Sequence, residues 1–373
     1  MDARRNALLG NRVLPVDIVL APAWWHHHEG ITFDEDFFFH PAKRVEVERK
    51  MEEALYERWG RFGLGVDRDK SLPVVGPVHL AAGYLISEML GCRVEYSDGS
   101  PPAVIPANAE SLEVAPDDAF RSPAFKRFEG LLDSLKAKYG YLCGDVNFSG
   151  ILNHALDVRG QQFLTDLYDA PEAAGAFLRG IAEVTERLAE GVGAATGTTS
   201  ISVNRNVRNI PRPVFLHSEC SHVMISVRQY EAFLMPFDAQ WSRTHRPFGI
   251  HYCGEDPHRY AEAFARLPHL DFLDVGWGGD VAKLREHLPD TFLNVRYSPV
   301  EIIRQSPDEI RGTVRRLVEA SGNPWLTGVC SINMDEKVTD EQISAIFEEV
   351  ECLREEYGGK AEGGRGKAEE IRK

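Results

Sequence analysis

The chain has 373 residues, of which 43% are hydrophobic and 27% charged, a composition typical of a globular protein with a large core. Acidic residues outnumber basic ones by 57 to 42, and the formal net charge of -15 argues against nucleic acid or an anionic membrane as a general partner. No apolar run approaches the roughly 20 residues that a membrane-spanning helix needs.

The cysteines indicate the compartment. The chain has six cysteines, Cys92, Cys143, Cys220, Cys253, Cys330 and Cys352. Six cysteines in a chain of this length are too sparse for a disulfide scaffold. The mildly apolar stretch at residues 13–22 contains Asp17 and lacks a cleavage site, so it predicts a strand rather than an export signal. We therefore expect reduced thiols and a cytoplasmic protein.

The two ends of the chain differ in composition from its body. The first 70 residues are rich in aromatic side chains, and the spacing of apolar residues predicts a helix over Pro41–Arg61. We interpret residues 1–70 as an N-terminal extension, or lid, packed on the main domain. Residues 358–373 are rich in Gly, Lys and Glu and predict a disordered or frayed tail.

From about residue 200, short apolar runs alternate with amphipathic stretches. The predicted strands are Ser200–Val203, Val214–Leu216, Phe248–Tyr252, Phe272–Val275, Phe292–Val295 and Leu326–Val329. The predicted helices between and after them are Gln229–Arg243, Pro257–Arg266, Val281–Leu288, Pro307–Ala320 and Asp340–Tyr357. This alternation favours an α/β fold, a (β/α)8 TIM barrel over residues 71–357 with the N-terminal extension before it.

Polar and thiol side chains collect at the ends of these predicted strands, where TIM barrels carry their chemistry. His251 and Cys253 are two residues apart on one strand, so they project to the same face about 6–7 Å apart. Imidazole nitrogen and thiolate sulfur suit Zn²⁺. Cys330, at another strand end, is the candidate third ligand, which would leave one position open for substrate. The alternative is that these residues simply pack in the core.

Several blocks of sequence resemble one known family. The segment Phe248–Gly254, with its His-Tyr-Cys-Gly, and the later Gly328–Cys330 look like the uroporphyrinogen decarboxylase superfamily, specifically its zinc-containing, corrinoid-linked methyltransferase branch. Residues Gly150–Glu172, Ser218–Ser226 and Tyr230–Phe237 are also similar to segments of that family, in the same order. The resemblance covers about residues 140–352 and implies that His251, Cys253 and Cys330 are zinc ligands.

The same resemblance implies an activity and a partner. We expect a zinc-dependent methyltransferase that moves a methyl group between a methyl ether, methylamine or thiol and a corrinoid (cobalamin) on a separate protein. The Arg-rich N-terminal segment of true uroporphyrinogen decarboxylases is replaced here by Trp24–Glu29, which argues against porphyrinogen decarboxylation. A metal-free lyase on the same barrel and a non-catalytic barrel with a structural zinc stay open as alternatives.

Further residues are candidates around this centre. Glu219 is a possible fourth ligand or general acid, with helix capping as its alternative, and Asp274 could orient His251. The candidate substrate pocket consists of residues from four parts of the chain: Trp24, Trp25, His26, His28, Asn147, His154 and Tyr297. The two tryptophans would suit an aromatic methyl ether or a quaternary ammonium group, and the alternative is that they belong to an N-terminal lid packed on the barrel.

Overall fold

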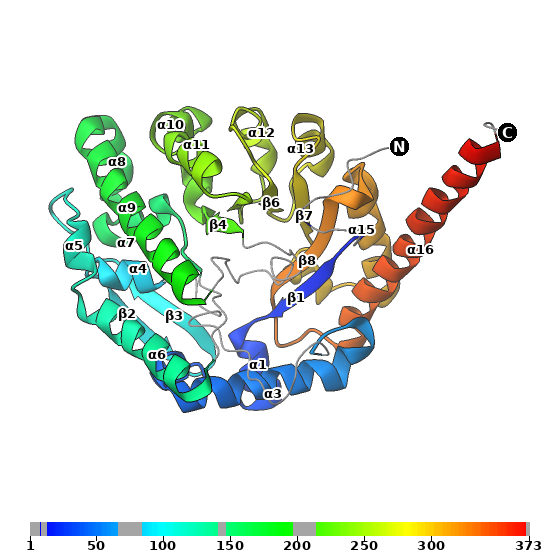
Figure 1. Ribbon diagram of the computed structural model, residues 1–373, viewed down its shortest axis with the longest axis horizontal. Coiled ribbons are helices and arrows are strands. Elements are labelled where there is room, and N and C mark those ends of the chain that lie inside the picture. The colour runs from blue at the N-terminus through cyan, green and yellow to red at the C-terminus, as the bar shows by residue number, and fades with distance from the viewer. Residues whose placement is uncertain (1–7, 9–12, 66–83, 141–146, 197–213, 371–373) are drawn as a thin grey trace.

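A computed structural model describes residues 8, 13–65, 84–140, 147–196 and 214–370 of the chain. Cys143 and the strand predicted at Ser200–Val203 lie outside these residues. The described part is built on one parallel sheet of six strands that curls into a half-barrel (Figure 1). Their order is β1 (Val16–Leu20), β8 (Thr327–Met334), β7 (Phe292–Arg296), β6 (Phe272–Val275), β5 (Phe248–His251) and β4 (Phe215–Ser218). The predicted α/β, TIM-barrel-like class is confirmed.

The strands form where the sequence has short runs of large apolar residues. Every residue of β5, β6 and β7 is buried, because the sheet is covered on both sides. Fully buried parallel strands read as continuous apolar runs rather than as an alternation, which is the pattern these segments show.

Helices follow the strands and cover the outer side of the sheet (Figure 1). They are η3 (Cys220–Met224), α10 (Val227–Phe233), α11 (Met235–Thr244), η4 (Pro257–Tyr260), α12 (Ala261–Phe264), α13 (Val281–His287), α14 (Pro299–Ile302), α15 (Pro307–Ala320) and η5 (Pro324–Leu326). Helix α15 has the predicted bounds and starts with a capping box formed by Ser306 and Glu309. The single helix predicted at Gln229–Arg243 is two helices, and Pro236 lies in the first turn of the second, where its missing N–H costs no hydrogen bond.

The first half of the chain supplies a strand to the sheet and a layer of helices. The helices are α1 (Pro22–Glu29), α2 (Glu35–Phe39), α3 (Pro41–Trp59), η1 (Gly60–Phe62), α4 (Tyr84–Met89), α5 (Pro116–Ala119), α6 (Pro123–Tyr139), α7 (Ile151–Arg159), α8 (Gln162–Asp169) and α9 (Pro171–Thr196). Strands β2 (Arg93–Ser97) and β3 (Ser100–Ile105) form an antiparallel hairpin.

The position of β1 corrects the boundary that we placed at residue 70. This strand pairs in parallel with β8 and is therefore part of the barrel sheet, not of an extension packed on it. A local pattern cannot reveal this, because the pairing joins residues more than 300 positions apart, such as Val16 and Val329.

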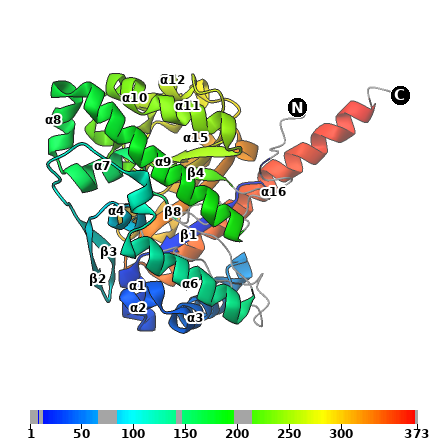
Figure 2. The same ribbon diagram turned by 60° about the vertical axis from the view of Figure 1, so that its left-hand side comes forward.

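The C-terminal segment also differs from our expectation. Helix α16 runs over Asp340–Glu370, so most of the predicted tail continues the helix, and its last part projects away from the body (Figure 2). Thr339 caps its start by accepting a hydrogen bond from the Gln342 N–H at 3.2 Å.

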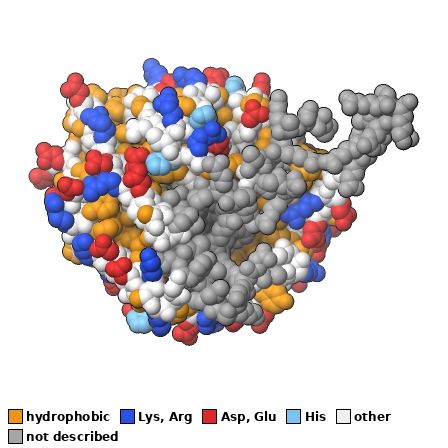
Figure 3. Space-filling model, viewed as in Figure 1, with side chains coloured by type: hydrophobic (Ala, Val, Ile, Leu, Met, Phe, Trp, Pro, Cys, Tyr) orange, Lys and Arg blue, Asp and Glu red, His pale blue; other side chains and the backbone are white. Residues whose placement is uncertain are grey.

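The surface of the described residues is mixed in charge. On the face shown in Figure 3, acidic and basic side chains are interspersed, and no extended basic patch is visible there. Within the described part of the chain, no helix combines the length and the apolar character needed to cross a bilayer.

Candidate metal centre

The register of the parallel strands brings the candidate residues to one edge of the sheet. His251 lies opposite Ser218 on one side and Asp274 on the other. Asp274 is in turn opposite Asn294, and Arg296 is opposite Cys330. Ser218, His251 and Arg296 end their strands, and Asp274 is next to the end of β6, while Asn294 and Cys330 lie in the middle of β7 and β8. Five neighbouring strands therefore bring polar groups to one place, towards the C-terminal edge of the sheet.

Three side chains in this place could hold a metal ion. Cys220, His251 and Cys253 each offer one ligand atom, and these atoms all lie within 4.8 Å of one another. His251 ends β5, Cys253 follows it, and Cys220 begins η3 immediately after β4. The imidazole Nε2 is 2.7 Å from the Cys253 sulfur. Two sulfurs and one imidazole nitrogen form a donor set that fits zinc.

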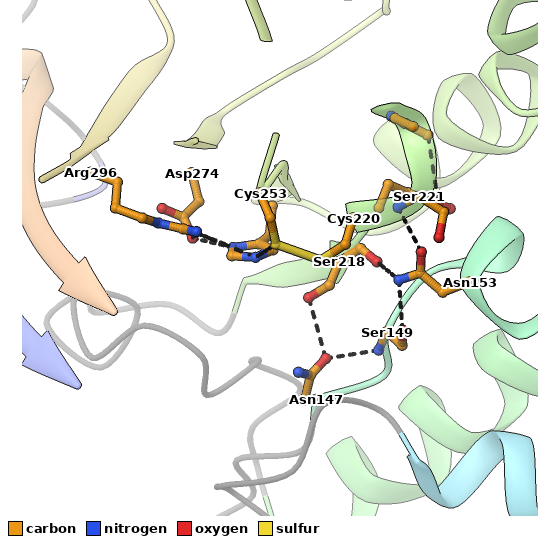
Figure 4. Close-up of a disulfide and its surroundings, with 12 residues drawn as sticks. Asn147, Ser149, Asn153, Ser218, Cys220, Ser221, Cys253, Asp274 and Arg296 are labelled. Atoms are coloured by element: carbon orange, nitrogen blue, oxygen red, sulfur yellow. Dashed lines mark hydrogen bonds and ion pairs between the residues drawn. A yellow bond between two sulfur atoms is a disulfide. The ribbon is translucent and has the colours of Figure 1, made fainter. Parts of the chain in front are cut away.

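Cys220 and Cys253 are also joined in this structure as a disulfide (Figure 4). This corrects the expectation that all six cysteines are separate thiols. The physical reason is a tertiary contact: β4 and β5 pair in parallel, and the Glu219 N–H donates to the His251 carbonyl at 2.9 Å, which brings the residues after the two strands together. Cys92, Cys330 and Cys352 are free thiols.

Asp274 fixes the orientation of the His251 ring. Its Oδ2 accepts a hydrogen bond from Nδ1 of His251, so that Nε2, on the other side of the ring, is directed at the Cys253 sulfur. Burial raises the pKa of the fully buried Asp274 carboxyl, but Arg296 and His251 outweigh burial and hold this pKa below its usual value. The carboxylate is therefore ionised and can act as the acceptor that a metal-bound imidazole needs.

Arg296 supplies the charge that balances Asp274. Its NH2 group is 3.2 Å from Oδ2 of Asp274 and 3.1 Å from Nδ1 of His251, and the side chain is almost fully buried. Arg296 directly follows the predicted strand Phe292–Val295, and the sequence did not indicate it as a member of the site. Its role follows from the register of β6, β7 and β8, which local sequence patterns do not show.

Cys330 lies beside this group without belonging to it. Its sulfur accepts a hydrogen bond from Asn294 at 3.2 Å, and its S–H faces Oδ1 of Asp274 at 3.7 Å. Of the three predicted ligands, the structure thus brings His251 and Cys253 together, and places Cys330 against the carboxylate that orients the histidine. Cys220, whose role our sequence interpretation left undecided, stands in the group instead.

Glu219 caps a helix in this structure. Its Oε1 accepts a hydrogen bond at 2.8 Å from the N–H of Ile151, the first residue of α7. The helix dipole stabilises a negative charge at this end of the helix. It also lies 3.6 Å from the buried His222 ring. A β-carbon at Gly150 would come within 2.4 Å of the Glu219 carboxyl carbon, so this approach requires glycine. The carboxylate is not among the grouped ligand atoms.

A polar cradle of Asn147, Ser149, Asn153 and Ser218 lies next to the metal group (Figure 4). Asn153 donates to the Ser218 carbonyl at 2.6 Å and accepts from the Ser221 N–H at 2.9 Å. These bonds hold both sides of Cys220. Asn147 accepts from the Ser149 N–H at 2.8 Å and from the Ser218 hydroxyl at 3.3 Å. The cradle therefore fixes where the thiol of Cys220 stands.

The proposed aromatic lining is part of the core. Residues 22–29 form the helix α1, in which positions two apart, such as His26 and His28, do not share a face. His26 bonds the Ile31 carbonyl and His28 bonds the Glu336 carbonyl, at 3.0 and 2.8 Å. Trp24 and Trp25 are 1% and 3% exposed and pack against each other, so neither presents a ring face to a ligand in this structure.

Two other predicted pocket residues also have partners inside the fold. The hydroxyl of Tyr297 donates to Gln305, in the segment between α14 and α15, while its N–H bonds the Cys330 carbonyl at 2.8 Å. The fully buried His154 ring lies 2.8 Å from the Ser87 hydroxyl and 2.7 Å from the Phe148 carbonyl. Burial lowers the pKa of this imidazole.

Comparisons with known proteins show where this fold recurs. No known protein family and no curated protein sequence matches the chain. Among solved structures, a methyltransferase from Methanosarcina mazei matches with a TM-score of 0.63 at 14% identity, over 91% of this chain and 94% of that one. A B12-independent methionine synthase from Shewanella sp. W3-18-1, solved with selenomethionine, matches with a TM-score of 0.50 at 11% identity, over 93% of this chain and all of the other. At these identities the likeness is one of fold, and the chain therefore shares its TIM-barrel-like fold with a methyltransferase and a methionine synthase.

Proposed function

We propose that this protein is a zinc-dependent methyltransferase that moves a methyl group between a small methylated substrate and a corrinoid carried by a separate protein. The observation that carries the proposal is the group of Cys220, His251 and Cys253, whose ligand atoms lie within 4.8 Å of one another at the strand ends of a TIM-barrel-like fold. The fold likeness to a methyltransferase, and the family resemblance of the sequence, support the reaction class.

The residues present fit a catalytic zinc. Three protein ligands leave one coordination position for a substrate atom, which is the usual arrangement of catalytic zinc sites. His251 would bind through Nε2, since Asp274 occupies the other side of its ring. Bound zinc would lower the pKa of a substrate thiol, or draw charge from the heteroatom that carries the methyl group. Buried Arg296 balances the charge of Asp274 and so keeps this anion available to the histidine.

Cys330 decides between two forms of the proposal. The family resemblance implies that it is the third ligand, in which case Cys220 would be an additional thiolate beside the metal. If all four residues bind at once, the site is closed and a structural zinc becomes the better interpretation. If Cys330 stays with Asn294 and Asp274, one position is open.

Metal analysis of purified protein tests the proposal first. We expect one zinc per chain, strongly reduced in Cys253→Ala and Cys220→Ala, and retained in Cys352→Ser, whose thiol lies exposed on α16. The zinc content of Cys330→Ala then shows whether that thiol is a ligand. Zinc absent from the reduced wild-type protein, or unaffected in Cys253→Ala, would end the proposal.

Methyl transfer is tested second. Zinc-loaded protein is incubated with cob(I)alamin, a free stand-in for the corrinoid protein, and with methyl ethers, methylamines and methyl thioethers. Methylcobalamin formed from one of these donors, and lost in Cys253→Ala, is the expected result. A zinc-loaded protein that methylates cobalamin from no donor, and demethylates methylcobalamin with no thiol, would favour the structural-zinc alternative.

A further inference from the structure

The two sulfurs of the metal group are the same two sulfurs that form the disulfide. Cys220 and Cys253 cannot be zinc-bound thiolates and a disulfide at the same time. Formation of the S–S bond removes two electrons, and the neutral disulfide sulfurs are no longer the thiolates that bind metal. We propose that these are two alternating states of the site, so that oxidation by hydrogen peroxide expels zinc and reduction allows it to rebind. The inference rests on the proposed function, and concerns its regulation.

The reaction balances without any further reagent. Each of the two zinc-bound thiolates gives up one electron, and an S–S bond forms between Cys220 and Cys253. Hydrogen peroxide takes both electrons and two protons from solvent, its O–O bond breaks, and two water molecules result. In the form in which Cys330 stays with Asn294 and Asp274, the zinc then loses two of its three ligands and leaves as the hydrated ion, since His251 alone is too weak a site to hold it.

The position of the two cysteines suits such an exchange. They are 33 residues apart in sequence but their α-carbons are 5.0 Å apart, a separation at which a disulfide forms without movement of the backbone. Both are partly exposed, so a small oxidant can reach them. On the Cys220 side Asn153 bonds the backbone at Ser218 and Ser221, and these contacts hold the segment that carries the thiol without involving a metal.

The other thiols in the described part of the chain are placed outside this reaction. Cys330 is 2% exposed and is engaged by Asn294 and Asp274. Cys92 is buried, and burial raises its pKa to about 11, so little of the reactive thiolate forms. Cys352 is exposed but lies on α16, away from the metal group, and is the natural control.

The test follows zinc and thiols together in the full-length, zinc-loaded protein. Peroxide is added in increments, released zinc is measured with a chromogenic chelator, and free thiols are counted after denaturation. We expect two thiols lost for each zinc released, a Cys220–Cys253 cross-link in the peptide map, and full recovery of both after dithiothreitol and zinc are added. Cys352→Ser should behave as wild type in all of these, apart from its lower starting thiol count.

Each contrary result has its own meaning. Zinc that leaves while Cys220 and Cys253 stay reduced, zinc that remains bound after the disulfide has formed, or a cross-link that includes Cys330 would overturn the inference and leave the proposed function standing. Cys330→Ser, which cannot form that last cross-link, should release zinc with the same ratio of two thiols to one metal ion. A reduced protein that takes up no zinc would overturn the proposed function itself.

Discussion

Replacing Asp274 by asparagine is the sharpest test of how the site is held together. The wild-type carboxylate accepts from His251 Nδ1 and faces Arg296 at 3.2 Å, Asn294 at 3.2 Å and the Cys330 sulfur at 3.7 Å. Asparagine keeps the shape but loses the charge. When its NH2 group is turned toward His251 it donates to Nδ1, so the ring proton moves to Nε2. That proton blocks the nitrogen that faces Cys253.

Two effects of this substitution can be estimated. Loss of a carboxylate behind a metal-bound histidine typically lowers metal affinity about 10–100-fold, which corresponds to roughly 1.4–2.8 kcal/mol. The ion pair with Arg296, at 3.2 Å and an effective dielectric constant of about 20, is worth about 5 kcal/mol before desolvation. Because the Arg296 guanidinium stays buried without a charged partner, we expect the free energy of unfolding of the metal-free protein to fall by about 3–5 kcal/mol. The loss is smaller if the asparagine oxygen still accepts a hydrogen bond from Arg296.

The assay measures zinc affinity by competition with a chelator, and stability by urea unfolding of the metal-free form. Asp271→Asn is the matched control, since Asp271 pairs with Arg246 at the start of β5, away from the metal group. Unchanged zinc affinity in Asp274→Asn, with a protein that is folded by circular dichroism, would refute the role given to this carboxylate.

Three further predictions concern the fold around the site. The Arg159 hydrogen bond lowers the pKa of Asp166, so Asp166→Asn should reduce the free energy of unfolding at pH 7. In urea titrations the difference from wild type should vanish as the pH falls below about 4 and through the lowered pKa, where the wild-type carboxylate becomes protonated. Gly150→Ala should cost about 1–3 kcal/mol because its β-carbon meets a carboxylate at 2.4 Å, whereas Gly130→Ala, in α6 with open space around it, should gain about 0.5–1 kcal/mol; equal changes would contradict the packing argument. Trp24→Ala should lower the free energy of unfolding by about 3–5 kcal/mol and leave zinc affinity unchanged, because Trp24 is a buried core residue. A large loss of zinc affinity in this variant would show that Trp24 does contribute to the metal site.

The errors in the N-terminal part have one cause. We expected the two tryptophans Trp24 and Trp25 to line the pocket, because nothing local distinguishes an aromatic pair that faces a ligand from one that faces the core. The structure puts both in a helix, with Trp24 stacked on His28 at 4.6 Å and close to Trp59 of α3 at 5.9 Å. His28 is a neighbour one turn along the same helix, whereas the contact with Trp59 joins α1 to α3 and comes from tertiary packing, which no local pattern shows.

The sequence by itself determined the features that depend on local periodicity. The stretch at residues 13–22 and five later apolar runs predicted all six sheet strands, although β8 continues to Met334, beyond its predicted end at Val329. The i, i+2 spacing of His251 and Cys253 indicated two candidate ligands close together, with His251 ending β5 and Cys253 two residues beyond it. Only the tertiary structure decided which residues join them. Cys220 arrives through the pairing of β4 with β5, and Asp274 and Arg296 through the register of β6 and β7, because a parallel sheet brings strand ends together across connections that no local pattern spans.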